Sequence, residues 1–164
     1  MKIIFLALTL LLSVPSFGQI KTANLTASGL TCSMCSKAIY KALVDLPIVD
    51  TVEVDIEKSS YLIKFKSTPD ISPEDIKKSV EDAGFAVASL KLTANFSSSD
   101  FLPNNEFRIQ GTLYRFIKGP KHGVNGMQSF TIVNKGFVSK KDFKKYSSLS
   151  LGSPLEASGY SVIF

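Results

Sequence analysis

The chain has 164 residues, of which 45% are hydrophobic and 20% are charged, and its formal net charge is +5 at pH 7. This composition is typical of a globular protein with a buried core, and it excludes a disordered or low-complexity chain. The length allows one medium domain or two small ones.

The first residues predict a cleaved export signal. Lys2 is followed by an apolar run, and small residues stand at Ser16 and Gly18. Because the apolar run is too short to span a bilayer, it favours a secretory signal peptide over residues 1–18 rather than an uncleaved membrane anchor. No later segment predicts a membrane span. We therefore expect a periplasmic or secreted protein.

Six elements are predicted in the part of the chain that follows the signal. Alternating apolar and polar residues predict strands over 22–27, 51–57, 61–66 and 88–95. Apolar residues at helical spacing predict a helix after the first strand, over 35–46, and another after the third, over 73–83. The order strand, helix, strand, strand, helix, strand predicts an α+β fold of the ferredoxin-like βαββαβ type.

The ends of the two helices carry typical signals. Pro47 follows the first helix and stops it. Ser72 and Asp75 have the spacing of a capping box around Pro73 at the start of the second helix, and Gly84 suits its end.

The only two cysteines of the chain, Cys32 and Cys35, fall in the loop that leads from the first strand into the first helix. A disulfide between them would close a very small loop, so it would stabilise the fold little. The N–H groups at a helix start favour thiolate over thiol, and two thiolates close together suit a soft cation. Zn(II) normally takes four ligands, whereas Cu(I) and Hg(II) accept two. A two-coordinate ion such as Cu(I) or Hg(II) therefore fits the two cysteines, whereas Zn(II) would need ligands from elsewhere.

At these residues the sequence resembles the heavy-metal-associated domain family, which includes copper chaperones, N-terminal modules of copper-transporting ATPases and the periplasmic mercury-binding protein. The family's loop reads Gly-Met-Thr-Cys-x-x-Cys, and here residues 29–35 read Gly-Leu-Thr-Cys-Ser-Met-Cys. The resemblance covers residues 20–96 and includes the family's late Asp-Ala-Gly-Phe corner at 82–85. It implies that Cys32 and Cys35 are the metal ligands and that the metal passes to a partner protein with Cys or Met ligands.

The resemblance also assigns roles to four neighbours of the cysteines. Leu30 replaces the usual Met, which is mainly a buried anchor under the loop, so Leu should preserve the packing. Phe85 matches an aromatic position beside the loop. Met34 occupies a variable position, and we expect it to face solvent, with a spare thioether ligand as the alternative. Zinc-selective members tend to carry an acidic residue where this chain has Thr31, which favours a monovalent soft ion. The resemblance therefore implies Cu(I) as the bound ion, with Hg(II) or Zn(II) as alternatives.

A carrier of this kind breaks no bond in a substrate, so we do not expect an enzyme. The alternative of a different class is a thioredoxin-like thiol–disulfide oxidoreductase, which also uses Cys-x-x-Cys at a helix start. That fold expects more βα units, and its motif usually contains Trp, which this chain lacks.

The composition changes after residue 96. Residues 97–103 begin with four small polar residues and end at Pro103, so they predict a linker between a metal domain over 19–96 and a second domain over 104–164. The second part predicts strands from its alternation, including one over 106–117 and one at the C-terminus, and a short helix over 139–148. We interpret it as a small β-rich domain. Four apolar residues are expected in its core: Phe107, Ile109, Phe130 and Ile132.

This second part is strongly basic. Residues 97–164 carry 9 Lys and Arg against 4 Asp and Glu, a net charge of +5, whereas residues 19–96 carry 9 against 10, a net charge of −1. The predicted export argues against nucleic acid as a partner. A solvated basic face is the simplest interpretation, and docking on an acidic partner or an anionic membrane surface is the alternative.

Overall fold

The computed structural model describes residues 18–30, 33–67, 70–118, 124–149 and 159–164. The predicted signal peptide, apart from Gly18, lies outside these residues, and so do Thr31 and Cys32. Within the described part of the chain, no helix has the length and apolar character needed to cross a bilayer.

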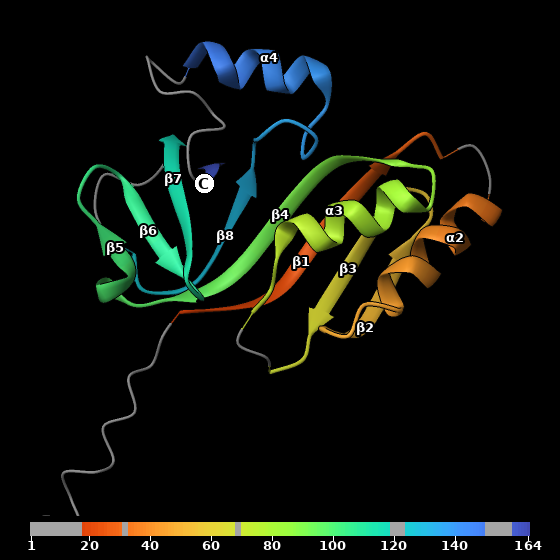
Figure 1. Cartoon of the computed structure of the whole chain (residues 1–164), viewed down its shortest axis with the longest axis horizontal. Helices are drawn as coiled ribbons and strands as arrows, with labels where there is room; N and C mark the ends of the chain where they lie inside the picture. Colours follow the sequence, from red (N-terminus) through yellow and green to blue (C-terminus); the bar gives the residue numbers. More distant parts are fainter. Residues whose placement is uncertain (1–17, 31–32, 68–69, 119–123, 150–158) are drawn as a thin grey trace, which may run out of the picture.

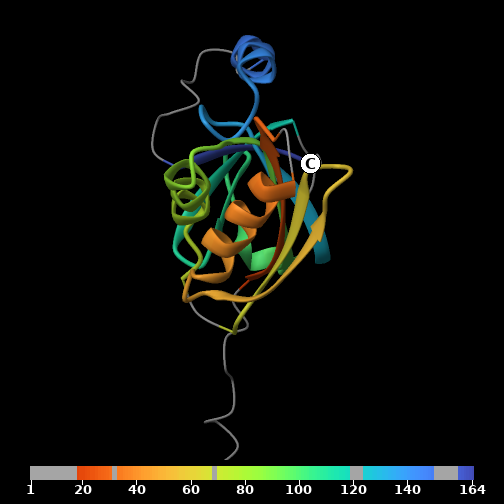
Figure 2. The ribbon, with the colours of Figure 1, turned by 90° about the vertical axis from the view of Figure 1, so that its right-hand side faces the viewer.

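The N-terminal half follows the predicted order of elements (Figure 1). It contains β1 (Gln19–Ser28), α2 (Ser33–Val44), β2 (Val49–Asp55), β3 (Ser60–Phe65), α3 (Pro73–Asp82) and β4 (Ala86–Phe96). The strands stand in the order β2-β3-β1-β4, and neighbouring strands are antiparallel. Figure 2 shows that both helices cover one face of this sheet. The ferredoxin-like α+β arrangement is therefore confirmed.

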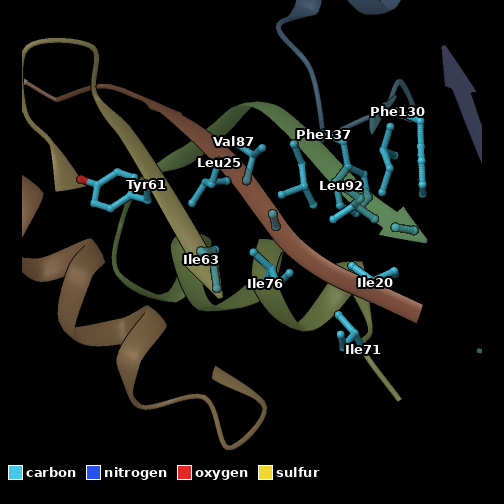
Figure 3. Close-up of a cluster of buried hydrophobic side chains, with 14 of the residues drawn as sticks. Ile20, Leu25, Tyr61, Ile63, Ile71, Ile76, Val87, Leu92, Phe130 and Phe137 are labelled. Atoms are coloured by element: carbon cyan, nitrogen blue, oxygen red, sulfur yellow. The ribbon is translucent and has the colours of Figure 1, made fainter. Parts of the chain in front are cut away.

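Alternation along the strands places apolar side chains between the sheet and the two helices. Leu25 of β1 lies opposite Leu90 of β4, and both are fully buried. Ile39 of α2 and Ile76 of α3 close this layer from the helix side, and Figure 3 shows Leu25 and Ile76 within it. Burying side chains of this size stabilises a fold by about 1.5–3 kcal/mol each.

The two ends of α3 differ in how well they match the predicted signals. Ser72 is the N-cap residue and Pro73 begins the helix, but the Ser72 side chain makes no capping hydrogen bond, so the predicted capping box does not form. At the other end Gly84 has a φ of 88°, and the Phe85 N–H donates to the Val80 carbonyl. This is a Schellman ending, which needs the left-handed conformation that glycine adopts without strain.

The C-terminal half continues the same sheet. It contains η2 (Ser98–Asp100), β5 (Phe101–Leu102), β6 (Glu106–Ile109), β7 (Thr112–Lys118), β8 (Gly126–Ile132), α4 (Lys140–Leu149) and β9 (Tyr160–Ile163). Strand β8 pairs antiparallel with β4, so that Phe130 lies opposite Leu92. The result is one nine-stranded sheet in the order β2-β3-β1-β4-β8-β9-β7-β6-β5.

Two features of this half differ from the sequence predictions. The predicted linker over 97–103 contains η2 and β5 instead, and Asp100 within it is buried, accepting hydrogen bonds from the N–H groups of Ser97 and Gly18. The single strand predicted over 106–117 is the hairpin β6–β7. Its turn residues Gln110 and Gly111 have φ values of 48° and 79°, as a tight type I′ turn requires.

An aromatic cluster forms the core of the C-terminal half. The Phe107 ring on β6 lies 5.2 Å from the Phe96 ring on β4 and 5.2 Å from the Phe130 ring on β8. Because three other strands separate β6 from β4 in the sheet, this contact shows that the sheet curls back on itself. All four core residues predicted for this half, Phe107, Ile109, Phe130 and Ile132, are at most 1% exposed, which confirms that prediction.

Replacing Phe107 by Ala should lower the free energy of unfolding by about 3–5 kcal/mol, because the change leaves a cavity inside the aromatic cluster. Urea unfolding followed by circular dichroism measures this loss. Tyr40→Ala is the matched control, since the Tyr40 side chain on α2 is 40% exposed and its removal should cost less than about 1 kcal/mol. Equal losses for the two variants would contradict the central place of Phe107.

Candidate metal site

The loop that carries the cysteine motif leaves the sheet at the end of β1. Ser28 pairs with Ala86 at the start of β4, and Gly29 follows with a φ of 86°. A Cβ atom on Gly29 would lie 4.0 Å from Cδ1 of Phe85. Phe85 is thus packed beside the start of the loop, where the family resemblance placed an aromatic side chain.

Cys35 is the third residue of α2 and lies in its first turn. Its side chain is partly exposed. The unpaired N–H groups and the positive dipole end of the helix stabilise a thiolate at this position. Cys35 is therefore placed where a soft cation can reach it. Cys32 lies outside the described residues, so its pairing with Cys35 stays a prediction.

Two residues that precede Cys35, Met34 and Leu30, differ in how far they are exposed. Met34 is 75% exposed, as expected for a variable position on the solvent side. Leu30 is partly buried and packs against the hydrophobic core, in agreement with the predicted role of an anchor under the loop.

Tyr61 is a residue of this site that the sequence interpretation missed. It belongs to β3 and is fully buried, and its hydroxyl donates a hydrogen bond to the Ser36 carbonyl at 3.4 Å. Burial raises the pKa of Tyr61, and the negative charge of a Cys35 thiolate raises it further. The phenol therefore lies within electrostatic reach of the thiol. In the sequence, Tyr61 is only one more large residue in an alternating strand, so no local signal marks it.

Side chains from two other elements fix the position of α2. Tyr61 of β3 holds the first turn through the carbonyl of Ser36. Ser79 of α3 donates a hydrogen bond of 2.8 Å to the Ala42 carbonyl near the other end of the helix. These bonds and the buried Ile39 keep the turn that carries Cys35 in a defined place on the sheet.

A family model for the heavy-metal-associated domain matches residues 24–86. The chain is also 33% identical over 86 residues to the mercuric transport protein periplasmic component of Shigella flexneri, an alignment that covers 52% of this chain and 93% of that protein. The chain belongs to the heavy-metal-associated domain family. The resemblance inferred from the Cys-x-x-Cys loop and the order of elements is therefore confirmed.

The chain is also similar to other members of the family. The copper chaperone CopZ of Staphylococcus haemolyticus (strain JCSC1435) is 30% identical over 63 residues, which cover 38% of this chain and 91% of CopZ. Copper-transporting ATPase 1 of Mus musculus is 24% identical over 146 residues, or 85% of this chain, but the chain spans only 10% of its length. A solved structure of oxidised MerP from Ralstonia metallidurans CH34 is 27% identical, with 43% of this chain and 96% of that chain covered and a TM-score of 0.39.

The family model itself matches only the first half of the chain. The family model ends at residue 86, whereas β8 and β9 lie far beyond it along the sequence. The family members named above are metal-binding and metal-transport proteins. Two of the names specify copper and one specifies mercury.

Tyr61→Phe should lower the free energy of unfolding by about 1 kcal/mol, because the bond to the Ser36 carbonyl is lost while the ring remains. Tyr114→Phe is the matched control. Tyr114 is also fully buried, and its hydroxyl has no hydrogen-bond partner among the described residues. Its removal should leave stability unchanged or raise it, since an unsatisfied buried hydroxyl is removed.

Urea unfolding of the two variants measures this difference, and alkylation of Cys35 in a Cys32→Ser background reports on the first turn of α2. We expect faster alkylation in Tyr61→Phe and an unchanged rate in Tyr114→Phe. If Tyr114→Phe loses as much stability as Tyr61→Phe, the bond to Ser36 does not hold the helix.

Proposed function

We propose that this protein binds Cu(I) through paired thiolates of Cys32 and Cys35 and acts as a chaperone or scavenger of the ion. The observation that carries the proposal is the partly exposed Cys35 in the first turn of α2, three residues after Cys32, in a chain of the heavy-metal-associated domain family. Exposure lets the ion and a partner reach the sulfur. The helix start stabilises its anionic form.

The donor set supports a soft ion with a low coordination number. The whole chain holds two cysteines and one histidine, and that histidine, His122, lies far along the sequence. Thiolates select Cu(I), whereas a structural Zn(II) site would need four ligands. The similarity to CopZ, which is named a copper chaperone, also supports copper.

Transfer of the ion would proceed by exchange of ligands. A thiolate or thioether of the partner protein enters the open coordination sphere, so that the ion is held by three sulfur atoms for a time. One cysteine of this chain then leaves as a thiolate or takes up a proton, and the second follows. No covalent bond of a substrate is broken, so the protein acts as a carrier rather than an enzyme.

In an exported protein this function requires that the two cysteine thiols are kept reduced. We infer that residues 1–18 are a signal peptide and that the mature protein is periplasmic or secreted, in line with the periplasmic relative. In an oxidising compartment the two cysteines can form a disulfide, which cannot take up the ion. The protein therefore needs a reductant, or metal that is already bound.

Hg(II) is the second candidate cargo. It is favoured by the 33% identity to a mercuric transport protein over nearly all of that protein's length. Two thiolates also satisfy Hg(II), so the donor set alone fits both ions.

Anaerobic titration of the reduced protein with Cu(I) should show one ion bound per chain, and either Cys32→Ser or Cys35→Ser should weaken binding by at least about a hundredfold, because one sulfur cannot replace two. Competition with a chromophoric Cu(I) chelator measures the affinity. Met34→Leu is the control, because it changes an exposed neighbour of Cys35 and should leave the affinity unchanged.

Parallel titrations with Zn(II) and Hg(II) separate the candidate ions. Parent-like Cu(I) binding by both serine variants would overturn the assignment of the two ligands. Turnover in an insulin-reduction assay would instead support the thiol–disulfide oxidoreductase.

A further inference from the structure

Helix α4 stands apart from the two helices that cover the sheet. Figure 1 and Figure 2 both show it at the edge of the molecule, beyond the ends of the strands. None of its ten residues is buried. It is nevertheless well defined at its start, because Ser139 and Asp142 cap it and the preceding Phe137 and Val138 are buried in the body of the protein.

One face of α4 is strongly basic. Lys140, Lys141, Lys144 and Lys145 are all exposed, and Asp142 is the one acidic residue of the helix, which leaves a net charge of +3. Elsewhere Lys58, Lys64, Lys77, Lys78 and Arg115 pair with carboxylates. Within the described parts of the chain, no carboxylate forms an ion pair with the lysines of α4.

The opposite face of α4 carries an apolar stripe. Phe143, Tyr146 and Leu149 follow one another at intervals of three residues, which places them on one side of a helix. Phe143 and Tyr146 are partly exposed, and Leu149 is 51% exposed. Lysines on one face with aromatic and aliphatic side chains on the other are typical of helices that lie in the interface of an anionic membrane.

Helix α4 lies towards the end of the sheet that carries the cysteine loop. Val138 forms a bridge with Ser89 near the start of β4, and α4 begins two residues later. The first residue of β4, Ala86, pairs with Ser28, which immediately precedes the loop. A surface that binds α4 therefore approaches the protein from the end where Cys35 is exposed.

We propose that α4 docks this protein on an anionic phospholipid surface. The lysines contact the headgroups, and the stripe of Phe143, Tyr146 and Leu149 enters the boundary between headgroups and acyl chains. A purely acidic protein surface would use the lysines but would not need the apolar stripe on the opposite face of the helix. This inference uses residues other than the two cysteines, so the result of its test does not depend on the proposed metal site.

Co-sedimentation of the full chain with vesicles tests the proposal. We expect binding to vesicles of equal parts phosphatidylcholine and phosphatidylglycerol at low salt, and no binding to phosphatidylcholine alone. Neutralising two lysines in K144Q/K145Q should weaken binding about thirtyfold. Leu149→Ser should weaken it about threefold to tenfold, because it removes apolar area from the inserted face.

The double substitution K37Q/K41Q on α2 is the matched control. Lys37 and Lys41 are also exposed, one helical turn apart, and the change removes the same charge. Parent-like vesicle binding by this variant supports a specific role of α4, whereas an equal loss would show that net charge alone drives binding and would overturn the proposal.

Absence of binding to the anionic vesicles would also overturn it. Dependence on the lysines but not on Leu149 would overturn the insertion of the apolar stripe, because electrostatic contact with the headgroups would then account for all of the binding.

Discussion

The backbone pairing of β4 on both of its sides is the interaction on which the rest of the structure depends. One side pairs with β1 along nearly its full length, from Gln19 opposite Asn95 to Ser28 opposite Ala86. The other side pairs with β8, which joins the C-terminal strands to the family's sheet. In an isolated four-stranded sheet of this order, β4 would be an edge with unpaired N–H and C=O groups. Here that edge is covered, and the same strand fixes the end of β1 from which the cysteine loop begins.

Much of the fold could be predicted because its signals are local. Alternation in β1 and β4 and helical spacing in α2 and α3 depend on neighbours in sequence, and they gave the correct order of elements. The pairing of β4 with β8 could not be predicted, because residues such as Leu92 and Phe130 meet only through the register of distant strands. The small polar residues that open 97–103 suggested a linker, yet Asp100 is buried, and its carboxylate accepts a hydrogen bond from the Ser97 N–H.

The candidate site was predictable where a motif marks it and hidden where it depends on packing. The Cys-x-x-Cys spacing and the following helical pattern placed Cys35 in the first turn of α2, as the structure shows. Tyr61 reaches the same turn from β3, across a contact between residues 25 positions apart. Phe85 was identified only through the family's corner motif, and its position beside Gly29 is again a product of the fold. Local sequence thus marks the two cysteines that we propose as ligands, while the sheet supplies the groups that hold the turn of Cys35 in place.

X-ray absorption at the copper edge of the reduced, Cu(I)-loaded protein tests the central claim most directly, because it reports the kind and number of atoms bound to the ion. We predict a spectrum with sulfur scatterers only, two per copper, which Cys35→Ser converts to a mixed set with fewer sulfurs. A parent spectrum dominated by nitrogen or oxygen, or one left unchanged by loss of Cys35, would contradict a paired thiolate site at the start of α2.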